Sequence, residues 1–95
     1  MAAYVIVDVQ ITDPKEYEAY KKLTPATITN HGGKFIVRGG ATETLEGEWE
    51  TGRIVVLEFP SVEVAKQWWS SNEYEIAKAI RHRTATTKMI LVQGV

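Results

Sequence analysis

The stretch at residues 4–17 reads YVIVDVQITDPKEY and joins a strand pattern directly to a helix start. Valines alternate with other residues through its first half, which is typical of a strand with one buried face. Asp13 and Pro14 follow, an N-cap residue and a proline suited to the first helical turn. A strand at 4–11 that passes at once into a helix is the beginning of a βαβ unit.

The same strand-then-helix order recurs in the second half of the chain. Further strands are predicted at 35–38, 53–59 and 88–93, with a first helix ending near Gly32 and a second that starts at Ser61, breaks at 70–72 and resumes over about 73–83. The order βαββαβ predicts one ferredoxin-like α+β domain over residues 1–95, with a four-stranded antiparallel sheet and two helices on one face. We expect its two central strands, the first and third, to run parallel.

The composition of the chain argues against several classes of function. The 95 residues carry 11 Lys and Arg against 12 Asp and Glu, a net charge of −1, which argues against a nucleic-acid binder. No apolar run is long enough for a membrane span, so we expect a cytoplasmic protein with no membrane contact. There is no cysteine, the two histidines lie far apart, and the glycine pairs do not complete a phosphate loop. We therefore expect no metal or nucleotide cofactor.

Alternation sorts the strand residues onto two faces of the sheet. The face expected under the helices carries Val5, Val7, Val9, Phe35, Val37, Val55, Leu57 and Phe59. The opposite face carries Tyr4, Ile6, Asp8, Gln10, Lys34, Ile36, Arg38, Ile54, Val56 and Glu58. Its apolar members form a patch too large to be left in water, so the sequence predicts a homodimer that packs sheet on sheet.

Three charged residues of the uncovered face are candidate catalytic residues. Arg38 could orient an oxyanion, and Asp8 or Glu58 could act as a general base with a raised pKa. The alternative is an ion-pair cluster that fixes the register of the dimer. His31 is a further candidate base because it titrates near neutral pH, although its place at a helix end equally suits a capping role.

Aromatic residues suggest where a ligand would bind. Trp68 and Trp69 are consecutive, so one is expected in the core and the other at a rim, a pocket or an interface. Ile36, Trp68 and Tyr74 are the candidate pocket residues, with core or interface packing as the alternative. The connection at 39–52 contains four Glu and no basic residue, which makes it a candidate protein-binding loop.

Several motifs resemble those of the family called domain of unknown function 1330. They are HGGKFIVRGG at 31–40, LEG at 45–47, VLEFPS at 56–61, Trp68 and SNEY at 71–74. The resemblance implies a dimeric α/β barrel, a superfamily that includes cofactor-free monooxygenases and muconolactone isomerase. It implies no catalytic residue, because the family has no established reaction.

Two hypotheses follow from this resemblance and from the residues. The chain acts on a small organic molecule without a cofactor, or it is a non-catalytic dimer that binds a ligand or a protein.

Overall fold

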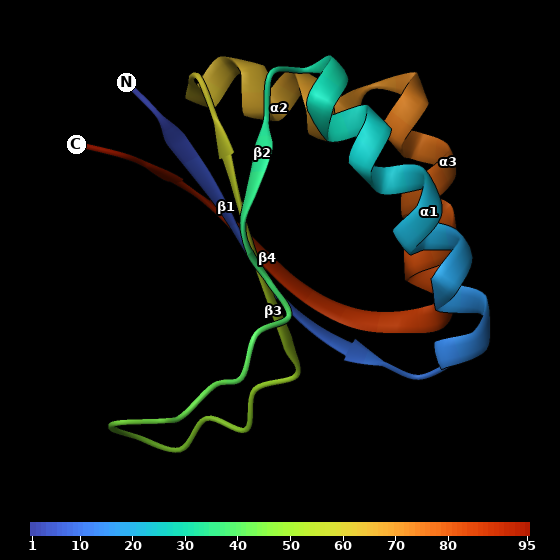
Figure 1. Cartoon of the computed structure of the whole chain (residues 1–95), viewed down its shortest axis with the longest axis vertical. Helices are drawn as coiled ribbons and strands as arrows, with labels where there is room; N and C mark the ends of the chain where they lie inside the picture. Colours follow the sequence, from blue (N-terminus) through green and yellow to red (C-terminus); the bar gives the residue numbers. More distant parts are fainter.

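Four strands and three helices make up the computed structural model, which describes all of residues 1–95. In chain order they are β1 (Ala3–Ile11), α1 (Pro14–Asn30), β2 (Lys34–Arg38), β3 (Arg53–Phe59), α2 (Val62–Ser70), α3 (Asn72–Thr84) and β4 (Ala85–Gln93). The helices cover one face of the sheet, and the connection between β2 and β3 extends away from the body of the domain (Figure 1). The predicted ferredoxin-like α+β architecture is confirmed.

The sheet has the strand order β2-β3-β1-β4 and is antiparallel throughout. The expectation that the first and third strands run parallel is wrong, because Tyr4 lies opposite Glu58 while Asp8 lies opposite Ile54. The physical reason is the α1 crossover, which returns the chain so that β2 runs the same way as β1. β3 lies between these two strands and is antiparallel to both.

The structure contains three helices where the sequence predicted two. Ser71 divides the second helical stretch, because its hydroxyl accepts a hydrogen bond from the backbone N–H of Tyr74 at 3.1 Å and caps α3. The backbone N–H of Ser71 also bonds to the carbonyl of Trp68, which closes α2. The predicted break at 70–72 is therefore the junction of two complete helices.

α1 begins and ends where the sequence indicates. The Asp13 side chain accepts a hydrogen bond from the backbone N–H of Glu16 at 3.2 Å, as an N-cap does. Pro25 lies inside the helix and does not end it. Thr24 precedes this proline, and its buried hydroxyl donates a hydrogen bond to the carbonyl of Tyr20 at 2.7 Å. His31 is the C-cap residue.

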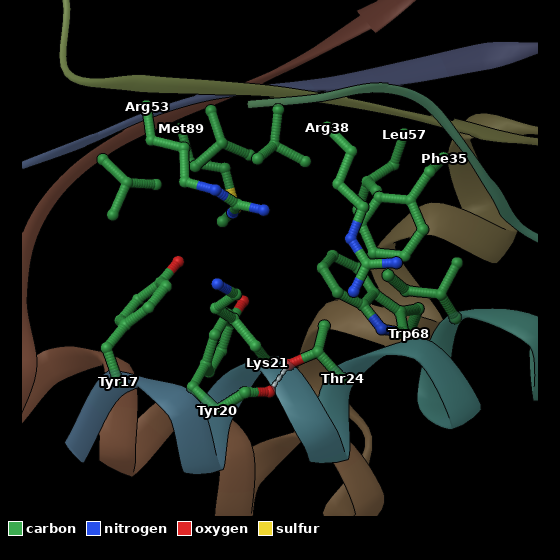
Figure 2. A pocket seen from close by; sticks show the side chains of 14 residues that line it. Tyr17, Tyr20, Lys21, Thr24, Phe35, Arg38, Arg53, Leu57, Trp68 and Met89 are labelled. Carbon is green, nitrogen blue, oxygen red and sulfur yellow. Dashed lines mark hydrogen bonds between the residues drawn. The ribbon is translucent and has the colours of Figure 1, made fainter. Parts of the chain in front are cut away.

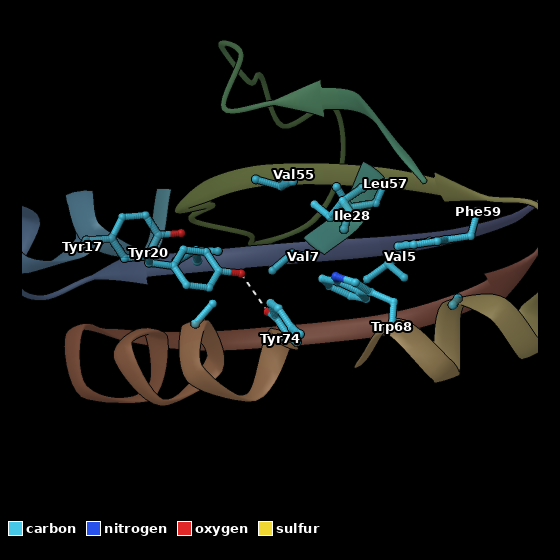
Figure 3. Packing of buried hydrophobic residues seen from close by; sticks show 13 residues of the cluster. Val5, Val7, Tyr17, Tyr20, Ile28, Val55, Leu57, Phe59, Trp68 and Tyr74 are labelled. Atoms are coloured by element: carbon cyan, nitrogen blue, oxygen red, sulfur yellow. Dashed lines mark hydrogen bonds between the residues drawn. The ribbon is translucent and has the colours of Figure 1, made fainter. Parts of the chain in front are cut away.

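The core between the sheet and the helices is built around aromatic rings (Figure 3). Trp68 stacks against Tyr74 with a centroid separation of 4.2 Å and against Phe59 at 5.2 Å. The two buried hydroxyls of Tyr20 and Tyr74 lie 2.7 Å apart and share a hydrogen bond. Of the two consecutive tryptophans, Trp68 is buried and Trp69 is exposed at the rim, as alternation around a helix requires.

No helix crosses the face of the sheet opposite α1, α2 and α3, which we call the open face (Figure 1). Ile90 is 59% exposed there, Ile36 49% and Val92 40%. Ile6, Ile54 and Val56 add to the same apolar surface. None of the three helices is long and apolar enough to span a membrane.

Candidate functional site

A β-bulge in β2 moves Arg38 away from the face where the sequence placed it. Phe35 pairs with Leu57, but the next residue to pair is Val37, which lies opposite Val56. The extra residue, Ile36, shifts the alternation, so Arg38 pairs with Val55, whose side chain points to the helices. The prediction that Arg38 and Val37 keep the simple alternation is wrong. Arg38 is on the helix side of the sheet, where it is solvent-exposed at the edge of the pocket, and Val37 is exposed on the open face.

Arg53 lies near Arg38 on the same side of the sheet. It is the first residue of β3 and pairs with Val9, a core residue of the helix-side face. Gly39 makes room for its side chain, because a Cβ at that position would lie 2.8 Å from the Arg53 Nε. No motif in the sequence marks Arg53 as a site residue. Its position two residues before Val55 in an alternating strand was the available signal.

These two arginines point into a pocket between the sheet and α1, which we call the arginine pocket (Figure 2). α1 contributes Tyr17, Tyr20, Lys21 and Thr24 to its other side. Ten of its fourteen lining residues are apolar, and no carboxylate or histidine is among them. The cavity volume is about 30 Å³, which is room for about one or two water molecules. An organic ligand therefore enters only if the exposed lining side chains, such as Arg38, move aside.

The electrostatics of the pocket favour a bound anion. Neither Arg38 nor Arg53 forms an ion pair, and the Arg38 guanidinium instead lies 4.3 Å from the centre of the Phe35 ring. Burial raises the pKa of the Tyr17 hydroxyl, and the positive charge of Arg53 beside it opposes that rise. Burial also raises the pKa of Tyr20, with the neighbouring Tyr74 adding to the effect. Both phenols are therefore neutral near pH 7 and cannot supply the missing negative charge.

The predicted polar cluster of Asp8, Arg38 and Glu58 does not form. Arg38 is on the other face, and the two carboxylates lie at opposite ends of β1 because β1 and β3 are antiparallel. Glu58 is opposite Tyr4. Tyr4 and Asp8 are four positions apart on β1, which corresponds to roughly 13 Å along a strand.

Each carboxylate of the open face has partners of its own. Asp8 accepts hydrogen bonds from the Trp49 indole and from the backbone N–H of Gly52, both at 2.9 Å. Glu58 pairs with Lys34 at 3.2 Å and accepts from the Tyr4 hydroxyl at 3.2 Å. This hydrogen bond raises the pKa of Tyr4.

His31 lies at the end of α1, outside the arginine pocket. Its Nδ1 is 2.8 Å from the carbonyl of Thr27, and its backbone N–H bonds to the carbonyl of Ile28. These contacts fit the capping alternative. The catalytic roles of Asp8, Glu58 and His31 stay predictions, and none of the three lines the pocket.

The three predicted pocket residues lie in different places. Trp68 lines the arginine pocket. Tyr74 is fully buried behind it, where it packs against Trp68 and bonds to Tyr20. Ile36 is on the open face, on the other side of the sheet. No group of three His, Asp or Glu side chains is close enough together to hold a metal ion.

The fold places the chain in the ferredoxin-like class of α+β proteins. Residues 2–95 match the family described as "Domain of unknown function (DUF1330)". The chain belongs to this family, as the motifs at 31–40 and 71–74 indicate. No protein with a curated description matches the sequence.

Solved structures share the fold at low sequence identity. A protein of unknown function from Rhodopseudomonas palustris is 18% identical with a TM-score of 0.79, over 99% of this chain and 82% of that one. SnoaB, a cofactor-independent oxygenase from Streptomyces nogalater, is 13% identical with a TM-score of 0.67, over 99% and 93%. A dimeric protein of unknown function and ferredoxin-like fold from Bacteroides fragilis is 16% identical with a TM-score of 0.59, over 98% and 96%.

Proposed function

We propose that this protein is a homodimer that binds a small organic oxyanion, such as a carboxylate, a phenolate or an enolate, in the arginine pocket. The observation that carries the proposal is the convergence of Arg38 and Arg53 on one hollow, with no carboxylate to pair with either. A guanidinium offers two parallel N–H donors to a planar oxyanion, so two of them suit an anion with delocalised charge.

The apolar wall of the pocket strengthens this interaction. Val7, Val55, Leu57 and Met89 line the pocket beside the arginines, so a ligand held there is partly removed from water although Arg38 itself is exposed. Tyr17 adds a hydroxyl that is neutral and therefore a hydrogen-bond donor. The pocket thus combines two guanidinium groups, the Tyr17 hydroxyl as a further hydrogen-bond donor, and an apolar wall. Small-molecule sites typically have this composition, with a few polar groups in a mostly apolar lining.

Cofactor-independent oxygenation is the second candidate function. The fold shared with SnoaB supports it, and so do the arginines, because two guanidinium groups would stabilise the enolate of an acidic substrate. Such an enolate carbon reduces O₂ and, with one proton, forms a hydroperoxide at that carbon. Isomerisation is less well supported, because it needs a general base at the reacting carbon and the pocket lining contains no carboxylate or histidine.

Acetylacetone is a suitable test ligand, because its enolate absorbs ultraviolet light at longer wavelength than its neutral form. Binding at neutral pH should increase the enolate absorbance, since the arginines lower the pKa of the bound molecule. Replacing Arg53 with Met should weaken this binding by about tenfold or more. Lys34→Met removes one positive charge from the open face and is the matched control, with binding unchanged. Equal binding by all three proteins would overturn the proposal.

The same titration in an oxygen electrode separates the two functions. Oxygen consumption that requires both acetylacetone and Arg53 would establish catalysis. Enolate binding without oxygen consumption would leave the protein as an oxyanion-binding protein.

The homodimer is supported by the open face. Its apolar side chains form a continuous surface over β2, β3, β1 and β4, and Ile36 and Ile90 are about half exposed. A surface of this kind usually marks an interface, and the similar protein from Bacteroides fragilis is described as dimeric. Sedimentation at micromolar concentration should give twice the mass of one chain.

A further inference from the structure

A second hollow lies on the other side of Trp68 and Met89, between α2, α3 and β4. We call it the Arg81 groove, and its volume is about 410 Å³. Pockets for small organic ligands typically measure roughly 300–1,000 Å³. The wall is mostly apolar and includes Met89 and Leu91, with Trp69, which is about half exposed, at the rim. The groove is therefore large enough for a small organic molecule in this conformation, whereas the arginine pocket is not.

Arg81 is a buried arginine of this groove whose Nε has no hydrogen-bond partner. It is only 5% exposed, and no carboxylate forms an ion pair with it. Arginine does not lose its proton in proteins, so this charge persists at every physiological pH. Burying a charge without a partner costs several kcal/mol. A missing anion is the direct explanation of this arrangement.

Thr87 adds a second unpartnered polar group to the same groove. Its buried hydroxyl has no hydrogen-bond partner, and β4 places it next to the α3 side of the groove. The remaining titratable lining residues, Lys66 and His82, are exposed, and neither is acidic. The groove therefore offers a guanidinium and a hydroxyl in its interior, the ammonium group of Lys66 near solvent, and no acidic residue.

The tyrosines near Arg81 do not supply that charge. Tyr17 and Tyr20 are close enough for the Arg81 charge to lower the pKa of each, but burial outweighs this effect and raises both pKa values. Both hydroxyls stay protonated near pH 7. The counter-charge must then come from outside the protomer.

We propose that the Arg81 groove is a second ligand site that takes an apolar monocarboxylate. The carboxylate lies on Arg81 and Thr87, and the apolar body lies against Trp69, Met89 and Leu91. A planar carboxylate has two oxygens, enough for the guanidinium fork and the hydroxyl together. A phosphate carries more charge and more acceptor oxygens than these two interior donors satisfy. This site is separate from the arginine pocket and goes beyond the proposed function.

Octanoate is the test ligand and octanol the matched uncharged one, with affinities measured by titration calorimetry. We expect octanoate to bind about tenfold or more tightly than octanol, because only the carboxylate satisfies the buried guanidinium. Arg81→Met keeps the length of the side chain and should remove this preference. Thr87→Val keeps the shape and should weaken octanoate binding by roughly threefold to tenfold, the usual effect of one lost hydrogen bond.

Two controls separate this site from the arginine pocket and from a structural role. Because the proposed arginine pocket also takes a carboxylate, octanoate and octanol are compared in Arg53→Met, and the preference for octanoate should persist there. Arg81→Met without ligand should melt at the same temperature as the wild type or higher, because it removes an unpaired buried charge. Equal affinity for octanoate and octanol would overturn the proposal, and so would octanoate binding lost in Arg53→Met but kept in Thr87→Val. If Arg81→Met fails to fold, the octanoate preference and Thr87→Val still decide the question.

Discussion

The two faces of the sheet hold their charges in different ways. On the helix side, Arg38, Arg53 and Arg81 point into hollows and none of them forms an ion pair. On the open face, Asp8 accepts two N–H donors and Glu58 pairs with Lys34. Charges that already have partners stabilise the structure, and charges without partners indicate where a ligand is missing. The comparison is the basis for the proposals that the helix side binds a ligand and that the open face mediates assembly.

The apolar residues of the two faces differ in how far the rest of the protomer buries them. Val7 is 5% exposed in a core covered by helices, whereas its neighbour Ile6 is half-buried on a face that no helix covers. Consecutive residues of one strand thus belong to the folding core and to a proposed interface. This pair allows the comparison to be tested within β1.

Val7→Asp and Ile6→Asp should produce the largest difference. A carboxylate at position 7 has no partner in the core, and burying it should cost several kcal/mol, comparable to the roughly 5–15 kcal/mol by which a native domain is stable. Ile6→Asp should keep the fold, because the new charge meets water when the protomers separate. Circular dichroism would follow folding, and sedimentation velocity would follow the mass.

The outcome that breaks this comparison is a folded dimer of Ile6→Asp. It would show that the open face is not the interface. Unfolding of both variants would show that the open face is needed for the fold of the protomer itself.

Gly33→Ala should have the next largest effect, and it acts on the helix side alone. A Cβ at position 33 would lie 2.5 Å from the Phe59 ring and 2.9 Å from Ile28, both buried. Overpacking of this kind typically lowers the free energy of unfolding by about 1–3 kcal/mol. Gly40→Ala is the control, because nothing lies within 4 Å of a Cβ there. Urea denaturation of both variants checks the difference, and equal losses would contradict it.

The architecture could be predicted from the sequence because local signals agree along the chain. Alternating valines mark β1, and Asp13, Ser61 and Ser71 carry the capping chemistry that starts helices. These signals act over a few residues, so they can be recognised without knowledge of the tertiary structure. The ferredoxin-like order of elements follows from them directly.

The site could not be predicted as well, because it depends on two features without a local signal. The bulge at Ile36 appears only when β2 pairs with β3, and it alone moves Arg38 to the helix side. The direction of β3 decides whether Asp8 and Glu58 lie together or apart, and it is set by the crossover through α1. The alternation of β3 places Arg53 on the same face as the buried Val55. That pattern by itself predicts a strand residue and gives no signal of a binding site.

Asp8→Asn should change the free energy of unfolding less than the substitutions above. It tests whether this open-face carboxylate has a structural role. The two Asp8 oxygens accept from Trp49 and Gly52 and so hold the base of the 39–52 connection against β1. An amide keeps one acceptor, so the free energy of unfolding should fall by about 1 kcal/mol. Cleavage by a glutamate-specific protease should also become faster, because the connection, whose four Glu are exposed, is held less firmly to β1.

Glu58→Gln is the matched control for Asp8→Asn. It disrupts a pair whose Lys34 partner is 70% exposed, so the change in stability should stay below about 1 kcal/mol and the cleavage rate should not change. Faster cleavage in Asp8→Asn alone would establish Asp8 as the anchor of the connection. If instead Asp8→Asn abolishes turnover of a substrate while cleavage stays slow, Asp8 is a general base, and the division between a binding face and an assembly face fails at this residue.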